Sequence, residues 1–255
     1  MINIGINDEK IKKLIKKNYD NNCVMIDDLF TLSLEKCKNS KIKFSLVCEE
    51  LINNENTKKL AKFYMDTTDC YLISKKVFER IATKDNLAGI IVYTEIEQAK
   101  LKDFKNFNNI LICDGIELSG NIGTIFRTAE ATQLDAIIFT NLKAKVYDDK
   151  IIHSSRGMIF QVPFVILSLE ETIKLLQNYN FIPVVCEPEQ GVDFKKFEYK
   201  GKLAFVVGSE RFGCDKKWFN QKPIKFLKIP MFGIMDSLNV GVAASLIMYE
   251  AKTKK

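Results

Sequence analysis

The chain has 255 residues, of which 47% are hydrophobic and 27% are charged, so it can bury one large core or two modest ones. It has no run of about 18 consecutive apolar residues and no N-terminal apolar stretch of signal-peptide length, so we expect a cytoplasmic protein without a membrane partner. The formal net charge of +6 is too small to identify a nucleic-acid partner by itself.

The composition changes along the chain. Residues 1–98 hold 16 basic and 15 acidic side chains, whereas residues 99–255 hold 22 and 17. All five prolines and ten of the twelve glycines follow residue 114. These shifts predict a domain over 1–98, a linker over 99–107 and a second domain over 108–255.

The cysteines do not form a recognisable metal or disulfide pattern. There are seven of them, spread along the chain without a C-x-x-C pair. An odd, scattered set favours reduced and mostly buried thiols. We therefore expect neither a disulfide framework nor a zinc site, and no other metal.

The first domain alternates segments of helical and of strand character. We expect a helix over 8–19, continued helical spacing over 25–37, a strand over 44–48, a helix over 56–64, a strand over 69–73, a helix from Ser74 and a strand over 89–94. This alternation predicts a small α/β domain with a covered sheet.

The second domain reads as repeated strand-loop-helix units. We expect strands over 109–114, 136–140, 182–186, 203–207 and 226–229, and helices over 121–129, 168–178 and 237–251. Short apolar runs bounded by polar residues are typical of a buried parallel sheet, which binds ligands at the carboxyl ends of its strands.

One such strand end carries the glycine-rich segment Gly208-Ser-Glu-Arg-Phe-Gly213. It lacks the G-x-G-x-x-G spacing and the Lys-Ser/Thr of a phosphate-binding loop. Taken alone, its glycines would only shape a turn and Glu210 would be solvated. The missing dinucleotide fingerprint after residues 109–114 also argues against a dehydrogenase.

Three segments in order resemble the motifs of the SpoU RNA methyltransferases. They are Asn121–Ala129, Val206–Gly213, and Ile229-Pro-Met followed by Asp236–Ala244. The resemblance covers residues 108–251, and each motif lies at a predicted strand end or helix start. Within this SPOUT superfamily the chain looks most similar to the thiostrepton-resistance type of ribosomal RNA methyltransferase, through Leu111–Glu117, Ser154–Gly157 and Val162-Pro163.

The resemblance implies transfer of a methyl group from S-adenosylmethionine to an RNA ribose 2′-hydroxyl. It implies 23S ribosomal RNA as the target, with transfer RNA and a catalytically idle RNA-binding protein as the alternatives. For structure it implies a C-terminal parallel-sheet domain with a deep trefoil knot, and a preceding domain similar to ribosomal protein L30e that binds RNA. It also implies a homodimer whose active site draws on both chains.

The matching catalytic positions are Arg127, Asn121, Glu210, Ser237 and Asn239. A guanidinium stays protonated, so we expect Arg127 to hold a phosphate and stabilise the developing alkoxide rather than to accept a proton. Asn121 and Ser237 have another interpretation as helix N-caps. Glu210 could instead form a salt bridge with Arg211 or with an arginine of a partner chain.

The matching methyl-donor positions are Glu187, Gly208, Ser209, Glu210, Ile229, Met231, Leu238 and Val240. Candidate RNA contacts are Arg156, Arg127, Lys143 and Lys145, although solvated surface charge is the safer interpretation for any one lysine. His153, the one histidine, matches no family position. Two departures, Thr124 and Phe212, remove no functional group but bear on the fit of the target nucleotide.

Overall fold

The computed structural model describes residues 2–254 except 18, 21, 34–38 and 84–87. The chain divides into two compact units. Unit 1 comprises Met1–Glu97 with Tyr147–Asp149, and unit 2 comprises Gln98–Val146 with Lys150–Lys255.

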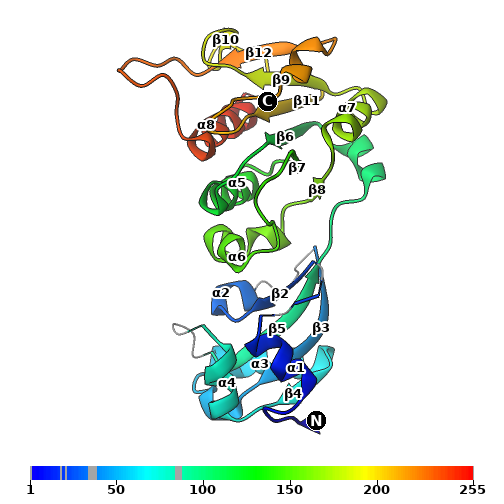
Figure 1. The fold of residues 1–255 in the computed structure, drawn as a ribbon, viewed down its shortest axis with the longest axis vertical. Coiled ribbons are helices and arrows are strands. Elements are labelled where there is room, and N and C mark those ends of the chain that lie inside the picture. Colours follow the sequence, from blue (N-terminus) through cyan, green and yellow to red (C-terminus); the bar gives the residue numbers. More distant parts are fainter. Residues whose placement is uncertain (1, 18, 21, 34–38, 84–87, 255) are drawn as a thin grey trace. The chain divides into compact units, whose positions relative to one another are not determined.

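Unit 1 is built around a mixed sheet in the order β1-β4-β3-β5-β2 (Figure 1). Its strands are β1 (Ile2–Asn3), β2 (Cys23–Ile26), β3 (Ser40–Val47), β4 (Cys70–Leu72) and β5 (Ile90–Ile96). Its helices are α1 (Glu9–Ile15), α2 (Leu29–Leu32), the short 3₁₀ helix η1 (Glu49–Leu51), α3 (Glu55–Thr67) and α4 (Lys75–Ile81). Unit 1 therefore has the α/β character predicted for this part of the chain.

The helical spacing predicted over 25–37 is wrong at its start. Met25 and Ile26 belong to β2, which pairs antiparallel with β5. All four residues of β2 are buried, so its side chains are apolar on both faces and give no alternation. The continuous apolar run therefore resembles one turn of a buried helix, and only α2 in this segment is helical. Residues 34–38 of the prediction lie outside the described residues.

Unit 2 contains a parallel sheet in the order β10-β12-β9-β11-β6-β7-β8 (Figure 1). Its strands are β6 (Asn109–Asp114), β7 (Ala136–Thr140), β8 (Phe164–Ile166), β9 (Ile182–Cys186), β10 (Val192–Asp193), β11 (Leu203–Val207) and β12 (Lys225–Lys228). Its helices are η2 (Leu101–Asn106), α5 (Ser119–Ala131), α6 (Asp149–Ser155), η3 (Met158–Phe160), α7 (Leu169–Asn178), η4 (Lys216–Asn220) and α8 (Val240–Thr253).

Both faces of this sheet are covered, which explains the apolar runs in its strands. Helices α7 and η4 pack on one face, where Ile112, Ile138 and Val206 join one core cluster with Trp218. Helices α5 and α8 lie together on the other face (Figure 1). The segment predicted as a linker, 99–107, forms η2, and Phe104 is fully buried in the core of unit 2.

Local sequence signals set the ends of the helices. Ser168 caps α7 and exchanges hydrogen bonds with Glu171, as in a capping box. The final helix begins at Val240, three residues later than predicted, because Asn239 rather than Ser237 caps it. Since the strands are parallel, the segments after β6, β7, β9, β11 and β12 all emerge at one edge of the sheet.

Candidate active site

A buried carboxylate ties two loops to the end of β6 at this edge. Asp114, the last residue of β6, is 3% exposed. Its Oδ2 accepts hydrogen bonds from the Asp215 backbone N–H at 2.8 Å and from Nε1 of Trp218 at 3.0 Å. Its Oδ1 accepts one from Nδ2 of Asn141 at 2.8 Å. Asp114 therefore fixes the loops after β7 and β11 relative to β6.

The sequence predicts Asp114 as the end of a strand, within the segment Leu111–Glu117, but gives its side chain no role. The signal that could have identified it is a carboxylate at the carboxyl end of a buried parallel strand, where a polar group must find partners.

The glycine-rich segment after β11 forms a tight, closed turn. Ser209 and Gly213 exchange two backbone hydrogen bonds of 3.0 Å each. Gly213 has a φ of 67°, in the left-handed region. A Cβ on Gly208 would lie 2.1 Å from the carbonyl carbon of Gly213, so no side chain fits there. The glycines do shape a turn, and the turn presents Glu210.

Three of the predicted catalytic residues are hydrogen-bonded in series. Nδ2 of Asn121, on α5, donates to Oε1 of Glu210. Nδ2 of Asn239 donates to Oδ1 of Asn121 at 3.0 Å. Oδ1 of Asn239 in turn accepts from the backbone N–H groups of Gly241 and Val242 at the start of α8. All three motifs therefore meet at Asn121, whose amide is fixed at both ends.

This arrangement corrects the alternatives considered for these residues. Asn121 is not an N-cap, because α5 begins at Ser119 and Leu118 is its capping position. Ser237 is not one either, and its hydroxyl donates to Asp236 at 3.3 Å instead of joining the series. Within the described chain Glu210 forms no ion pair with Arg211 and bonds to Asn121.

Arg127 lies on the same helix as Asn121 but does not join the series. Arg127 is six positions after Asn121, which places the two about 120° apart around the helix axis. Arg127 is exposed and forms no hydrogen bond or ion pair with a described residue. Its guanidinium is therefore available to a group from outside this chain.

The positions predicted to bind the methyl donor lie after three neighbouring strands. Glu187 follows β9, Gly208 and Ser209 follow β11, and Ile229 and Met231 follow β12. The glycine and the serine are half-buried, as are Ile229 and Met231. Burial, with a smaller effect of Glu189, raises the pKa of Glu187 above its ordinary value.

The backbone of the loop before α8 has unused hydrogen-bonding groups. Among the described residues, no backbone–backbone hydrogen bond involves residues 231–238. Leu238 is 38% exposed, whereas Val240 is buried as the first residue of α8. Free N–H and C=O groups beside half-buried apolar side chains suit a flat heterocyclic ligand.

The candidate RNA contacts are all exposed. Arg156 has a φ of 49° and follows the last residue of α6. Lys143 forms an ion pair with Glu117 at 2.6 Å. Its hydrogen bond lowers the pKa of Glu117, so this carboxylate partly neutralises the lysine. Lys145 is exposed close by in the sequence.

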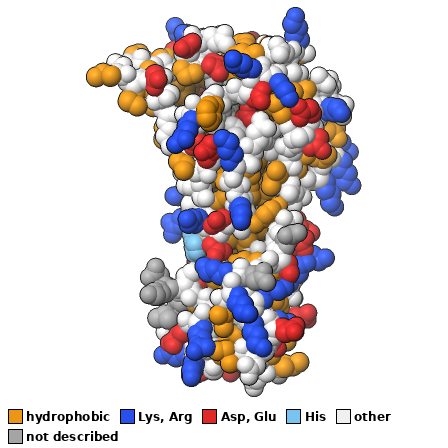
Figure 2. Space-filling model, viewed as in Figure 1, with side chains coloured by type: hydrophobic (Ala, Val, Ile, Leu, Met, Phe, Trp, Pro, Cys, Tyr) orange, Lys and Arg blue, Asp and Glu red, His pale blue; other side chains and the backbone are white. Residues whose placement is uncertain are grey.

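Large apolar side chains are exposed at this end of unit 2. They gather at the tip of the loop before α8, which projects from the rest of unit 2 (Figures 1 and 2). The tip consists of Phe232, Ile234 and Met235. A second group, the α8 stripe, recurs at helical spacing and consists of Val242, Leu246 and Tyr249. Exposed apolar surface of this extent is typical of an interface.

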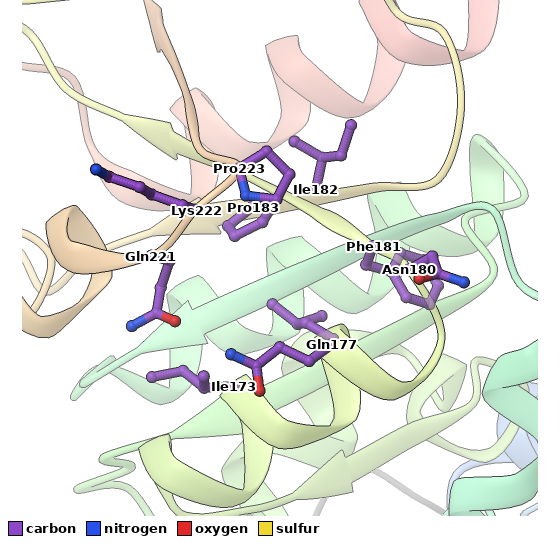
Figure 3. A pocket seen from close by; sticks show the side chains of 10 residues that line it. Ile173, Gln177, Asn180, Phe181, Ile182, Pro183, Gln221, Lys222 and Pro223 are labelled. Carbon is purple, nitrogen blue, oxygen red and sulfur yellow. The ribbon is translucent and has the colours of Figure 1, made fainter.

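A cavity of about 250 Å³ lies at the opposite edge of the sheet (Figure 3). It is lined by the end of α7, including Ile173 and Gln177, by Phe181 and Pro183 at the start of β9, and by Pro223. None of the predicted site residues lines it. Its position at the amino end of β9 separates it from the hydrogen-bonded series by the length of the strand.

The described residues contain neither a metal-binding cluster nor a membrane-spanning helix. No group of three or more His, Cys, Asp or Glu side chains there is arranged to hold a metal ion. No helix in the same residues is long and apolar enough to cross a membrane.

Comparison with known proteins identifies chains of similar sequence. The model of the SpoU rRNA Methylase family matches residues 108–249. A Staphylococcus aureus (strain MSSA476) protein named as a TrmH family tRNA/rRNA methyltransferase is 33% identical over 188 residues, 71% of this chain and 75% of that protein.

Solved structures share the fold over both units. An AdoMet-bound rRNA methyltransferase from Sinorhizobium meliloti matches with a TM-score of 0.81 and 20% identity, covering 99% of this chain and 97% of that one. The structure of an RNA 2′-O ribose methyltransferase matches with a TM-score of 0.76 and 23% identity, covering 100% and 99%.

Proposed function

The chain belongs to the SpoU rRNA methylase family, and from that premise we propose that it methylates a ribose 2′-hydroxyl of 23S ribosomal RNA with S-adenosylmethionine as the donor. The family itself places the chain among the AdoMet-dependent RNA methyltransferases. The atom that is methylated and the RNA that carries it are the proposal.

The hydrogen-bonded series of Glu210, Asn121 and Asn239 is the observation that carries this proposal. Three segments far apart in sequence bring these polar groups together at the carboxyl ends of parallel strands, where such sheets place their ligands. An amide held at both ends can orient a ribose hydroxyl without rearranging, which is how positioning accelerates a transfer reaction.

The residues after β9, β11 and β12 fit S-adenosylmethionine. Ile229, Met231 and Leu238 offer apolar contact for an adenine, and the unpaired backbone groups of 231–238 can bind its edge. Gly208 and Ser209 allow the donor to approach the backbone closely. Glu187 and Val240 are further predicted donor positions. When bound, this donor supplies a sulfonium methyl group, so the chain need only align the ribose oxygen.

We propose that Arg127 binds a phosphate of the RNA and stabilises the alkoxide that develops on the ribose oxygen. Its exposed guanidinium has no partner among the described residues, so it is free to do so. We expect Arg127→Lys to lose about 100-fold or more in kcat while the Kd for S-adenosylmethionine is unchanged, because a lysine lacks the planar two-pronged fork. Single-turnover methyl transfer and calorimetric donor binding measure the two. Near-normal turnover contradicts this role.

A homodimer explains why Arg127 stands apart from the series on its own chain. The α8 stripe supplies an apolar surface for a second copy, on the helix that packs against α5. The proposed knot is supported by the family and by the position of β12, which lies between β9 and β10 although it follows both.

The proposed shared site has a sharp test. Arg127→Ala and Glu210→Gln are each expected to be inactive as homodimers. If each site takes Arg127 from one chain and Glu210 from the other, mixed dimers have one intact site, and equal mixing restores about a quarter of wild-type turnover. No recovery in verified mixed dimers means that both residues come from one chain.

For unit 1 we propose an RNA-binding role. Its exposed α3 lysines, among them Lys59 and Lys62, suit phosphate contacts. The match of the rRNA methyltransferase structure across both units supports ribosomal RNA as the target. The described cysteines are free thiols, which suits a cytoplasmic location.

The first experiment is methyl transfer from labelled S-adenosylmethionine to separate RNA pools, one with 23S ribosomal RNA fragments and one with transfer RNA. Label on the ribosomal pool, absent with Arg127→Ala, is the expected result, and mapping of the modified ribose identifies the atom. Label on transfer RNA alone overturns the target. No label on any RNA despite donor binding points to a catalytically idle RNA-binding protein.

A further inference from the structure

The turn that carries Glu210 also displays an aromatic ring. Phe212 is 76% exposed, whereas Phe126, Phe139 and Phe205 of the same unit are fully buried. Leaving a phenylalanine in water forgoes the free energy of burying it, so the exposure requires a physical cause.

The backbone of the turn holds Phe212 outward. Its N–H donates to Oγ of Ser209 at 3.0 Å, and the two hydrogen bonds between Ser209 and Gly213 close the turn behind it. Gly208 packs directly against the backbone of Gly213, which leaves little room for the turn to fold inward. The backbone of the turn therefore presents the ring at the surface.

A charged side chain lies against this ring, unlike the apolar loop tip at Phe232, Ile234 and Met235. Nζ of Lys143 lies 5.2 Å from the ring centroid of Phe212, within reach of a cation–π interaction. The same lysine pairs with Glu117, and Arg211 is the preceding residue. These three side chains together carry one net positive charge. A ring bordered by such charges is a poor interface for another protein's apolar core, but it suits a flat base joined to phosphates.

We propose that Phe212 stacks on an unpaired base of the substrate RNA and so positions the nucleotide whose ribose reaches Glu210 and Asn121. This inference rests on the proposed function. Glu210 and Phe212 are two residues apart, so their Cα atoms lie within about 7 Å of each other, close to the reach of one nucleotide. The carboxylate of Glu210 faces inward to Asn121 while the ring of Phe212 faces out. Glu210 would therefore contact the ribose and Phe212 the base of the same nucleotide. Recognition by stacking favours a loop or bulge over a helix.

Kinetics separates stacking from a structural role. Phe212→Leu keeps an apolar side chain but removes the ring, and we expect its KM for RNA to rise about tenfold with kcat and the Kd for S-adenosylmethionine nearly unchanged. Phe212→Tyr, the matched control, keeps the ring and should keep the wild-type KM. Equal KM values for the wild type and Phe212→Leu overturn the proposal while leaving methyl transfer established.

Fluorescence gives a test that does not depend on activity. The natural chain has one tryptophan, Trp218, which is fully buried, so Phe212→Trp adds an accessible reporter. We expect single-stranded oligoadenylate to quench this added emission more strongly than an abasic ribose-phosphate oligomer of equal length. Equal quenching by both overturns stacking, as does an added tryptophan that acrylamide cannot reach in the RNA-free protein, because a second copy then covers the ring. If no RNA is methylated, the proposed function fails, yet this comparison still decides whether Phe212 binds bases.

Discussion

The two ends of the parallel sheet in unit 2 differ in how their polar groups are used. At the carboxyl end, the side chains of Asn121, Glu210 and Asn239 bond to one another across three segments. At the amino end, the cavity beside α7 is lined by apolar side chains and by amides such as Gln177. The cavity is the more obvious hollow, but under the proposed function the cross-linked polar groups position the reaction.

The difference has a physical basis. Asn121 is buried, and a buried polar group is stable only when it is bonded, so its two hydrogen bonds hold the turn at Glu210 and the start of α8 in place. Asp114 does the same for the loops after β7 and β11. The lining of the cavity imposes no such order, since exposed amides can bond to water. Orientation rather than volume therefore distinguishes the two ends.

The largest effect should follow from breaking the series at its centre. Asn121→Ala removes the group that both Glu210 and Asn239 bond, so we expect kcat to fall about 100-fold. Donor binding should change less, because Glu210 is the one predicted donor position for which a hydrogen bond to Asn121 is described. Single-turnover methyl transfer and calorimetry measure these quantities. A loss of less than threefold would show that the series only supports the fold.

A smaller effect should come from the turn that holds Glu210. In Gly208→Ala the new Cβ meets backbone, so we expect the free energy of unfolding of unit 2 to fall by about 1–3 kcal/mol. Urea unfolding followed by Trp218 emission reports on this unit alone, since the tryptophan lies in its core. Gly120→Ala is the matched control, because a Cβ there meets nothing within 4 Å. Equal stability of the two variants would mean that the turn adjusts freely.

The sequence predicts the centre of unit 2 well. The strands at 109–114, 136–140, 182–186 and 203–207 are confirmed at both ends. Each is a short apolar run that ends at a polar residue or a glycine, so the sequence itself marks the end of the strand. In unit 1 the residues of β2 gave no such contrast, because burial on both faces removes the alternation that distinguishes a strand from a helix.

The site is only partly contained in the sequence. Resemblance identifies Asn121, Glu210 and Asn239, but not that Asn121 links the other two. Ser237 and Asn239 are equally good N-caps by residue type, so the start of α8 could not be chosen without the tertiary contact to Asn121. The strands β8 and β10, of three and two residues, are too short for a periodic signal.

The smallest effect is expected at the amino end of the sheet. Gln177→Leu makes the cavity lining more apolar without touching the series, and β9 separates the cavity from Glu187 by about 16 Å. We expect kcat/KM within twofold of wild type and a Tm within about 2 °C, as for an exposed substitution. Methyl-transfer kinetics and thermal unfolding of the same preparation measure both. A tenfold loss of kcat/KM at unchanged Tm would reverse the comparison, because the cavity would then bind a molecule that the reaction needs.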